Sequence, residues 1–343
     1  MLSSCNYNVL FCKCTETNSV FMTHALPHKT KQFFVVLIKL SIVFGAFYFI
    51  YHKIVNNEQI RFMAFVGFVS KKGLFYPKTI LFILFLTLIN WFFEILKWQN
   101  LAASVKKISF KEALAQSLSA LTASLFTPNR IGEYGAKPAY FEAPLRKQIL
   151  LLTLLGNLSQ MLATVLFGGI GLVFFVAQFD LGIAYQNLSG LLLVIGWFAF
   201  FIRYVVKQHK LKYKGMSLQR LILHIKTIPF KIHYTNIAFA MLRYAVFSFQ
   251  FYFLLKVFGA SVTYAEAIMT ITSMYLLVSA IPSIFIFDVV VKGSVAVFLF
   301  SFLNVNELIV LSTIMSMWLL NFVLPSVLGS YYVLNFNWQT ATE

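Results

Sequence analysis

Two short segments bring charged and helix-breaking residues into a chain that is otherwise strongly apolar. In each segment an acid precedes a lysine by four residues, and a proline precedes the acid by five or six. Basic side chains in such a segment can hold a phosphate, and the acids can pair with an amine or carry a proton. The chemistry they predict is the binding of a charged headgroup. The residues are Pro128, Arg130, Glu133 and Lys137 in the first segment and Pro282, Asp288 and Lys292 in the second.

A purely structural interpretation of the two segments stays open. An acid four residues before a lysine is the favourable order for an ion pair within one helix, so each pair could neutralise its own helix and bind nothing. We favour a shared site, because an unpaired backbone group in hydrocarbon costs several kcal/mol and a charge at the centre of a membrane helix costs roughly 2.5–3.5 kcal/mol. Paired interruptions of this kind point to a transporter site near the membrane midplane.

Further polar side chains recur at helical spacing within apolar segments, which predicts faces that point into a helix bundle. Arg243 is the most demanding, because arginine keeps its proton and needs an anion or carbonyl partner. We expect this partner to be Glu133, Asp288 or a ligand phosphate. The other members of these faces are Asn90, Glu94, Lys97 and Trp98; Thr153, Asn157, Gln160 and Thr164; Gln250; and Trp318 and Asn321.

Two alternatives stay open for these polar faces. Hydrogen bonds between helices explain Asn157, Gln160 and Asn321 as well as contacts with a substrate do. Glu94 and Lys97 lie near one end of their apolar segment, so an ion pair at the membrane interface would also explain them.

The composition indicates whether this chain folds in water or in a membrane. Hydrophobic residues make up 59% and charged residues 11%, whereas a soluble domain carries about a quarter charged residues. The chain is therefore expected to be an integral membrane protein. Its net charge of +17 lies mostly in loops between apolar runs, where positive-inside topology and anionic lipids explain it. We do not expect nucleic acid to be a partner.

The apolar segments predict an all-α polytopic membrane protein with about six full transmembrane helices and two broken or re-entrant helical hairpins in an inverted-repeat arrangement. Residues 33–335 form the single membrane domain, between a disordered N-terminal tail (1–32) and a C-terminal tail (336–343). We hypothesise that translation begins at Met22 and that residues 1–21, which hold all three cysteines, are not made. The full spans are expected at 33–51, 79–98, 149–176, 188–206, 237–258 and 307–334, the third broken at Gly168, Gly169 and Gly171.

Loop charge predicts the orientation of the second half of the chain. Residues 203–236 carry eight basic residues and no acid, which places them in the cytoplasm, with residues 177–187 outside. Upstream, residues 110–146 could dip into the membrane and return or cross it once. Charge does not decide between these two, because each model puts a similar number of cations on the wrong side.

The order of several motifs resembles the transmembrane domain of the lysylphosphatidylglycerol synthase/flippase family. The motifs are "NWFFEILKWQNL", "TPNRIGEYGAKPAYF", "LRYAVFSFQFYFLLKVFG" and "AIPSIFIFDVVVKGSVAVF", and the resemblance covers most of residues 79–335. It implies paired re-entrant helices in an inverted arrangement, which favours re-entry of residues 110–146. It also implies site roles for Arg130, Glu133, Asp288 and Lys292.

This chain departs from that family in two respects. The second element is often rich in glycine around its proline, whereas here "IPSIFIFDVVVKG" has bulky residues. The soluble aminoacyl-transfer domain of the synthase is not found in the sequence, so we do not expect this chain to make a lysyl-lipid.

The sequence thus predicts a lipid flippase of the bacterial cytoplasmic membrane. A polar or anionic lipid is the expected partner, with no cofactor and no metal, and a homo-oligomer stays open. The expected substrate-binding residues are Arg130, Glu133, Lys137, Arg243, Gln250, Asp288 and Lys292, supported by Asn90, Glu94, Asn157, Gln160 and Asn321. The alternatives are an intramembrane lipid-modifying enzyme and a non-catalytic membrane subunit that partners a separate enzyme.

Overall fold

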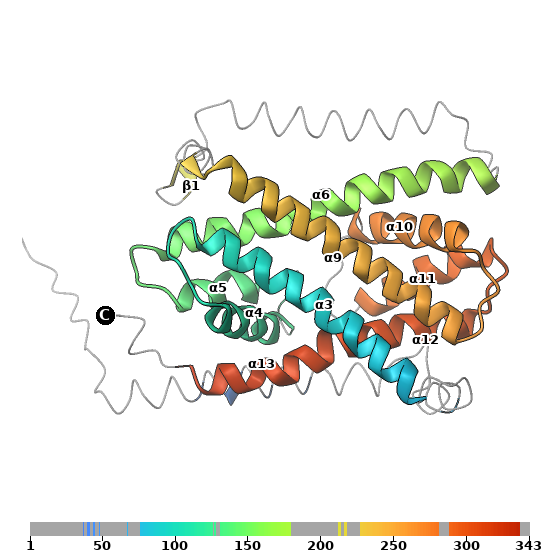
Figure 1. The fold of residues 1–343 in the computed structure, drawn as a ribbon, viewed down its shortest axis with the longest axis horizontal. Coiled ribbons are helices and arrows are strands. Elements are labelled where there is room, and N and C mark those ends of the chain that lie inside the picture. Colours follow the sequence, from blue (N-terminus) through green and yellow to red (C-terminus); the bar gives the residue numbers. More distant parts are fainter. Residues whose placement is uncertain are drawn as a thin grey trace, which may run out of the picture.

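Helices account for nearly all of the described chain (Figure 1). This computed structural model describes residues 76–125, 127, 131–179, 227–280 and 288–336, and ten further positions within residues 37–67 and 212–217. The side chains of residues 288–290 lie outside this description. One pair of two-residue antiparallel strands, β1 (Lys212–Tyr213) and β2 (Met216–Ser217), accompanies the helices.

The helices form two series with the same order of lengths: long, short, short, long. The last long helix of the second series contains one π-helical turn, η2, through which it runs on without a break. The first series is α3 (Pro77–Ala102), α4 (Phe110–Ser124), α5 (Gly132–Ala139) and α6 (Arg146–Phe179). The second is α9 (Phe230–Val257), α10 (Tyr264–Ala280), α11 (Asp288–Ser301) and α12 (Glu307–Trp318) with η2 (Leu319–Val323) and α13 (Leu324–Leu334).

Four helices of the described part are long and apolar enough to cross a membrane, which is compatible with a multi-pass membrane protein. They are α3, α6, α9 and the continuous helix Glu307–Leu334. They confirm the helices predicted at 79–98, 149–176, 237–258 and 307–334. Of the span predicted at 33–51 only five positions are described, all helical, and the span predicted at 188–206 lies outside the described residues. The tails and the pieces around Pro128 and Pro282 also lie outside them.

The predicted break in the third span is wrong, because α6 is continuous from Arg146 to Phe179. Its glycines admit a neighbouring helix instead. A Cβ atom on Gly171 would lie 2.9 Å from the carbonyl oxygen of Met269 in α10, and one on Gly168 would lie 2.9 Å from that of Thr272. Residues 230–236 of the predicted cytoplasmic segment 203–236 are the first residues of α9, and their side of the membrane stays a prediction.

α3 and α9 lie side by side in the middle of the molecule and run in opposite directions (Figure 1). Asn100 of α3 donates a hydrogen bond to the carbonyl of Ile232, near the start of α9. Toward the other end of the pair, Gln250 of α9 donates to Thr87 of α3. The two helices therefore present their polar faces to each other along most of their length.

The first short helix of each series packs against the last long helix of the other series. α4 lies along α13, where Thr122 Oγ1 donates to the carbonyl of Ser326 at 2.9 Å. A Cβ atom on Gly329 of α13 would come within 2.3 Å of the Leu118 carbonyl oxygen. α10 packs in the same way on the glycines of α6. The two series thus exchange equivalent contacts.

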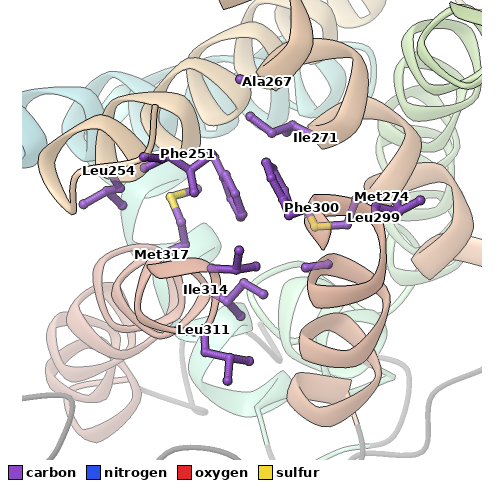
Figure 2. Packing of buried hydrophobic residues seen from close by; sticks show 14 of the residues in the cluster. Phe251, Leu254, Ala267, Ile271, Met274, Leu299, Phe300, Leu311, Ile314 and Met317 are labelled. Carbon is purple, nitrogen blue, oxygen red and sulfur yellow. The ribbon is translucent and has the colours of Figure 1, made fainter. Parts of the chain in front are cut away.

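Two apolar clusters flank the central helix pair. The larger joins α9, α10, α11 and α12 and contains Phe251, Ile271, Phe300 and Ile314 (Figure 2). The smaller joins α3, α4 and α6 around Trp98, Leu101, Ile149 and Leu152, which are at most 1% exposed. These clusters hold the polar faces of the long helices in fixed positions.

α4 begins with a capping box, which yields a first prediction. Ser109 Oγ accepts from the backbone of Glu112, and the Glu112 carboxylate accepts from the backbone of Ser109. We expect Ser109→Ala to lower the free energy of unfolding by about 0.5–2 kcal/mol. The hydrogen bonds from Ser109 hold the pKa of Glu112 below its usual value. The carboxylate's contribution is therefore complete above the usual pKa of about 4.3 and is lost as the pH falls through the lowered value.

Thermal unfolding of the detergent-solubilised protein as a function of pH tests this cap. The difference in Tm between wild type and Ser109→Ala should narrow in strongly acidic buffer. A difference that stays constant down to the lowest tolerated pH would contradict the role of Glu112.

Candidate functional site

Five charged side chains lie in two neighbouring groups, which we call together the charged cluster. One group joins α3 to α9, and the other is a pair within α5 that reaches α3 through a contact with the Trp98 ring. The set contains three cations and two carboxylates. All but Arg243 belong to residues that are at most 9% exposed. Its members are Glu94 and Lys97 of α3, Glu133 and Lys137 of α5, and Arg243 of α9.

Glu94 is shared between two cations. Its Oε2 atom lies 2.7 Å from Lys97 Nζ and 3.1 Å from Arg243 Nη1. The first contact is a short ion pair within α3, and the second joins α3 to α9. The attraction between such charges is strong in a medium of low dielectric constant.

Arg243 lies halfway along α9. Besides Glu94, its Nη1 atom donates to Gln160 Oε1 of α6 at 3.3 Å. Its Nε atom is buried and makes no hydrogen bond within the described part of the chain. Glu94 is a partner that the sequence did not predict for Arg243. The pairing with Asp288, whose side chain lies outside the described residues, or with a ligand phosphate stays a prediction. The sequence could not identify the pair with Glu94, because α3 and α9 are far apart in the chain.

α5 supplies an ion pair within its own helix. Lys137 Nζ lies 2.6 Å from Glu133 Oε1 and 4.3 Å from the centre of the Trp98 ring, in a cation–π contact. Trp98 in turn donates to Gln116 of α4 at 2.7 Å. The favourable spacing predicted from the sequence is thus realised as a pair that is 5% exposed on each side chain.

α6 connects α5 and α9 through amide side chains. Asn157 donates to the hydroxyl of Tyr134 in α5 at 3.0 Å, and Gln160 lies against Arg243. Asn236, seven residues before Arg243 on α9, donates to Ser159. The hydrogen bonds between helices that were one explanation of these residues are therefore present.

A second group of polar side chains, which we call the amide cluster, lies between α3 and α9. Its members on these two helices come before Glu94 on α3 and after Arg243 on α9. Asn90 donates to Asn321 Oδ1 at 2.8 Å, and Asn321 donates to Gln250 Oε1 at 3.0 Å. Gln250 donates to Thr87 Oγ1 at 2.8 Å. Asn90 and Gln250 are fully buried and Asn321 is 4% exposed. The amide cluster thus joins α3, α9 and η2.

The π-helical turn η2 is centred on Asn321, and turns of this kind often mark functional positions. The backbone carbonyl of Asn321 accepts a hydrogen bond from the indole of Trp91 at 3.3 Å. The turn therefore places Asn321 where both its side chain and its backbone reach α3.

The structure brings together some of the predicted site residues and leaves others outside its description. Glu133, Lys137 and Arg243 belong to the charged cluster, with Glu94, Asn157 and Gln160 beside them. Gln250, Asn90 and Asn321 form the amide cluster. Lys292 lies over the Phe322 ring at 5.8 Å. Arg130 and the side chain of Asp288 lie outside the described residues.

The sequence placed Lys97 and Trp98 on a polar face but did not identify them as site residues. It also left an interfacial ion pair open for Glu94 and Lys97. In the structure Lys97 is 3% exposed and Trp98 is 1% exposed, and both belong to the bundle interior. The four-residue spacing from Asn90 through Glu94 to Trp98 was the signal for that position. Gln116 and Tyr134 had no such signal.

Comparison with known proteins adds no relative. The chain matches no protein-family model, and searches of curated proteins and of solved structures also find no match.

Proposed function

We propose that this protein is a lipid flippase that moves a polar or anionic lipid headgroup across the bacterial cytoplasmic membrane. The observation that carries the proposal is the charged cluster, because Glu94, Lys97 and Arg243 belong to helices long enough to span a membrane and Arg243 lies at mid-length of α9. Ionic side chains at such a position are costly and mark substrate or ion pathways. The expected partner is therefore a membrane lipid.

The charge of the cluster favours an anionic group. Among the described residues, Lys97, Lys137 and Arg243 face two carboxylates, Glu94 and Glu133. One positive charge of these five side chains is thus in excess. A bound phosphate would neutralise it, and arginine is well suited to binding phosphate because its guanidinium offers parallel N–H donors.

We propose an inverted repeat as the frame of the site, with six spans in all. Three observations support it: the matching order of helix lengths, the antiparallel pairing of α3 with α9, and the exchange of α4 and α10 between the long helices of the two series. The shared acid-to-lysine spacing of α5 and α11 supports it further. In transporters built this way, rocking of one repeat against the other exposes the site to each side in turn.

The resemblance to the lysylphosphatidylglycerol synthase/flippase transmembrane family supports the same function. We propose that residues 79–335 represent that membrane domain and that the basic residues before α9 face the cytoplasm. No nucleotide-binding motif occurs in the sequence. A membrane gradient, or the gradient of the lipid itself, would drive transport. Asp288 and Lys292 of α11 would receive the headgroup in the second half of the cycle.

Translocation of tail-labelled lipid in proteoliposomes tests the proposal. We expect Arg243→Ala and Glu133→Gln each to abolish translocation, with the protein still monodisperse and helical. Lys106→Ala serves as the control, because Lys106 pairs with Glu142 in a bridge that is about half exposed. Wild-type rates in both site variants would overturn the proposal, and covalent conversion of the lipid would show an enzyme instead.

A further inference from the structure

We propose that Glu94 is a built-in competitor for the substrate phosphate: it holds Arg243 in the empty site, and the phosphodiester of the lipid headgroup takes its place. This inference rests on the proposed flippase function and deepens it by naming the ligand group and the residue that it displaces. The juxtaposition behind it is the contact of one carboxylate oxygen with two cations from different helices.

The two contacts of Glu94 are not equivalent. Lys97 belongs to the same helix, one turn away, and lies at 2.7 Å, whereas Arg243 belongs to α9 and lies at 3.1 Å. If the contact between Arg243 and Glu94 is broken, Glu94 and Lys97 still neutralise each other. A carboxylate left with one cation remains paired, so the exchange strands no buried charge.

Arg243 is also the cation that a ligand can reach. Its side chain is 19% exposed, whereas those of Lys97 and Lys137 are 3% and 5% exposed. Its buried Nε atom has no hydrogen-bond partner in the described part of the chain. Two oxygens of a phosphodiester can accept from Nε and from one terminal nitrogen of the same guanidinium, which is the favoured bidentate geometry. A phosphodiester would thus use both Nε and a terminal nitrogen, whereas among the described residues Glu94 contacts the terminal nitrogen Nη1.

The charge count selects the class of headgroup. A phosphodiester carries one negative charge, which matches the single excess positive charge of the charged cluster. An amine on the headgroup would need a carboxylate of its own, but Glu133 already lies 2.6 Å from Lys137. The ligand class is a phospholipid whose headgroup is otherwise uncharged, such as one that carries glycerol.

Calorimetric titration of purified protein in detergent tests the competitor role. The probe is dihexanoyl phosphatidylglycerol. We expect Glu94→Gln to bind it about tenfold more tightly than wild type or better, because a competitor worth about 1.4 kcal/mol has been removed. We expect Arg243→Gln to weaken binding by about a hundredfold, and the gain from Glu94→Gln to vanish when Arg243→Gln is added. An unchanged affinity in Glu94→Gln would overturn the inference.

Two further variants serve as controls for effects of net charge and of folding. The double variant Glu94→Gln/Lys97→Met removes one charge of each sign, so it frees Arg243 at constant net charge and leaves no unpaired lysine. It should keep the tenfold gain. Glu142→Gln changes the charge as Glu94→Gln does but acts on a bridge to Lys106 that is about half exposed, and it should give no gain. A gain of equal size in Glu142→Gln would show a general charge effect and overturn the competitor role.

Two more probes distinguish the source and the class of the ligand. Dimethyl phosphate has the same phosphodiester without acyl chains and should bind far more weakly, whereas equal affinity would indicate a soluble phosphate rather than a lipid. Dihexanoyl phosphatidylcholine should bind more weakly than phosphatidylglycerol, and equal binding would overturn the assigned class. Measuring both binding and translocation distinguishes the two proposals. If the lipid is translocated but Glu94→Gln binds it no more tightly, only the competitor role of Glu94 is wrong. If the lipid binds but is not translocated, the flippase function is wrong.

Discussion

Replacement of Glu94 by alanine is expected to lower the free energy of unfolding by about 3–5 kcal/mol, since it leaves buried cations without their anion. Lys97 has its nearest carboxylate at 2.7 Å in Glu94 and is 3% exposed. Arg243 loses its ion pair with Glu94 in the same step. The chain contains a matched surface pair, Lys106 and Glu142, at 3.0 Å. Glu142→Ala should cost less than about 1 kcal/mol, because both partners remain hydrated.

Unfolding in mixed micelles with increasing sodium dodecyl sulfate would compare these two alanine variants directly. Adding Lys97→Met to Glu94→Ala should recover part of the lost stability, because the stranded ammonium group is then replaced by an apolar chain of similar length. Equal losses in Glu94→Ala and Glu142→Ala would mean that the buried pair is hydrated like the exposed one, which contradicts its burial.

The second large effect is expected at Gly132, where α5 begins. A Cβ atom there would lie 2.2 Å from the carbonyl oxygen of Ala123 and 2.7 Å from its carbonyl carbon, both in the backbone of α4. Gly132→Ala must therefore push α5 away from α4 and move Glu133 and Lys137 with it. We expect translocation to fall by more than about tenfold and the free energy of unfolding to fall by about 1–3 kcal/mol, as is usual for overpacking.

Gly135, in the same helix, supplies the control. Among the residues that the structure describes, a Cβ atom there would meet nothing within 4 Å. Gly135→Ala should keep the transport rate and stabilise α5 by about 0.5–1 kcal/mol, because alanine loses less backbone entropy in a helix. Translocation rates and Tm values of the two variants, measured side by side, check the prediction. A loss of equal size in both would show that flexibility of the segment matters rather than the contact with α4.

The inward faces of the long helices could be predicted from the sequence, because helical spacing fixes which side chains share a face. Asn90, Glu94 and Trp98 are buried as their spacing indicated. Which helix supplies the partner could not be predicted in the same way. Arg243 was assigned to the acids of the broken segments, whereas the crossing of α3 and α9 brings it to Glu94.

Glycine was the other source of error. From the sequence, we predicted a break at Gly168 and Gly171, because glycine is a poor helix former. Their missing side chains allow α10 to approach α6 instead, and the helix stays continuous. A single sequence does not distinguish the two roles, because close helix packing and helix interruption both favour the smallest residue.

The exchange of short helices between the two series has a consequence for biogenesis. α4 is synthesised early, but its hydrogen-bonded neighbour Ser326 follows Thr122 by 204 residues. At about 5–20 residues per second, the ribosome needs on the order of 10–40 s to make that stretch. During this interval the small polar face of α4 has no native neighbour on that side. The contact between α4 and α13 can therefore form only after α13 has been synthesised, and until then the first half of the chain lacks this contact.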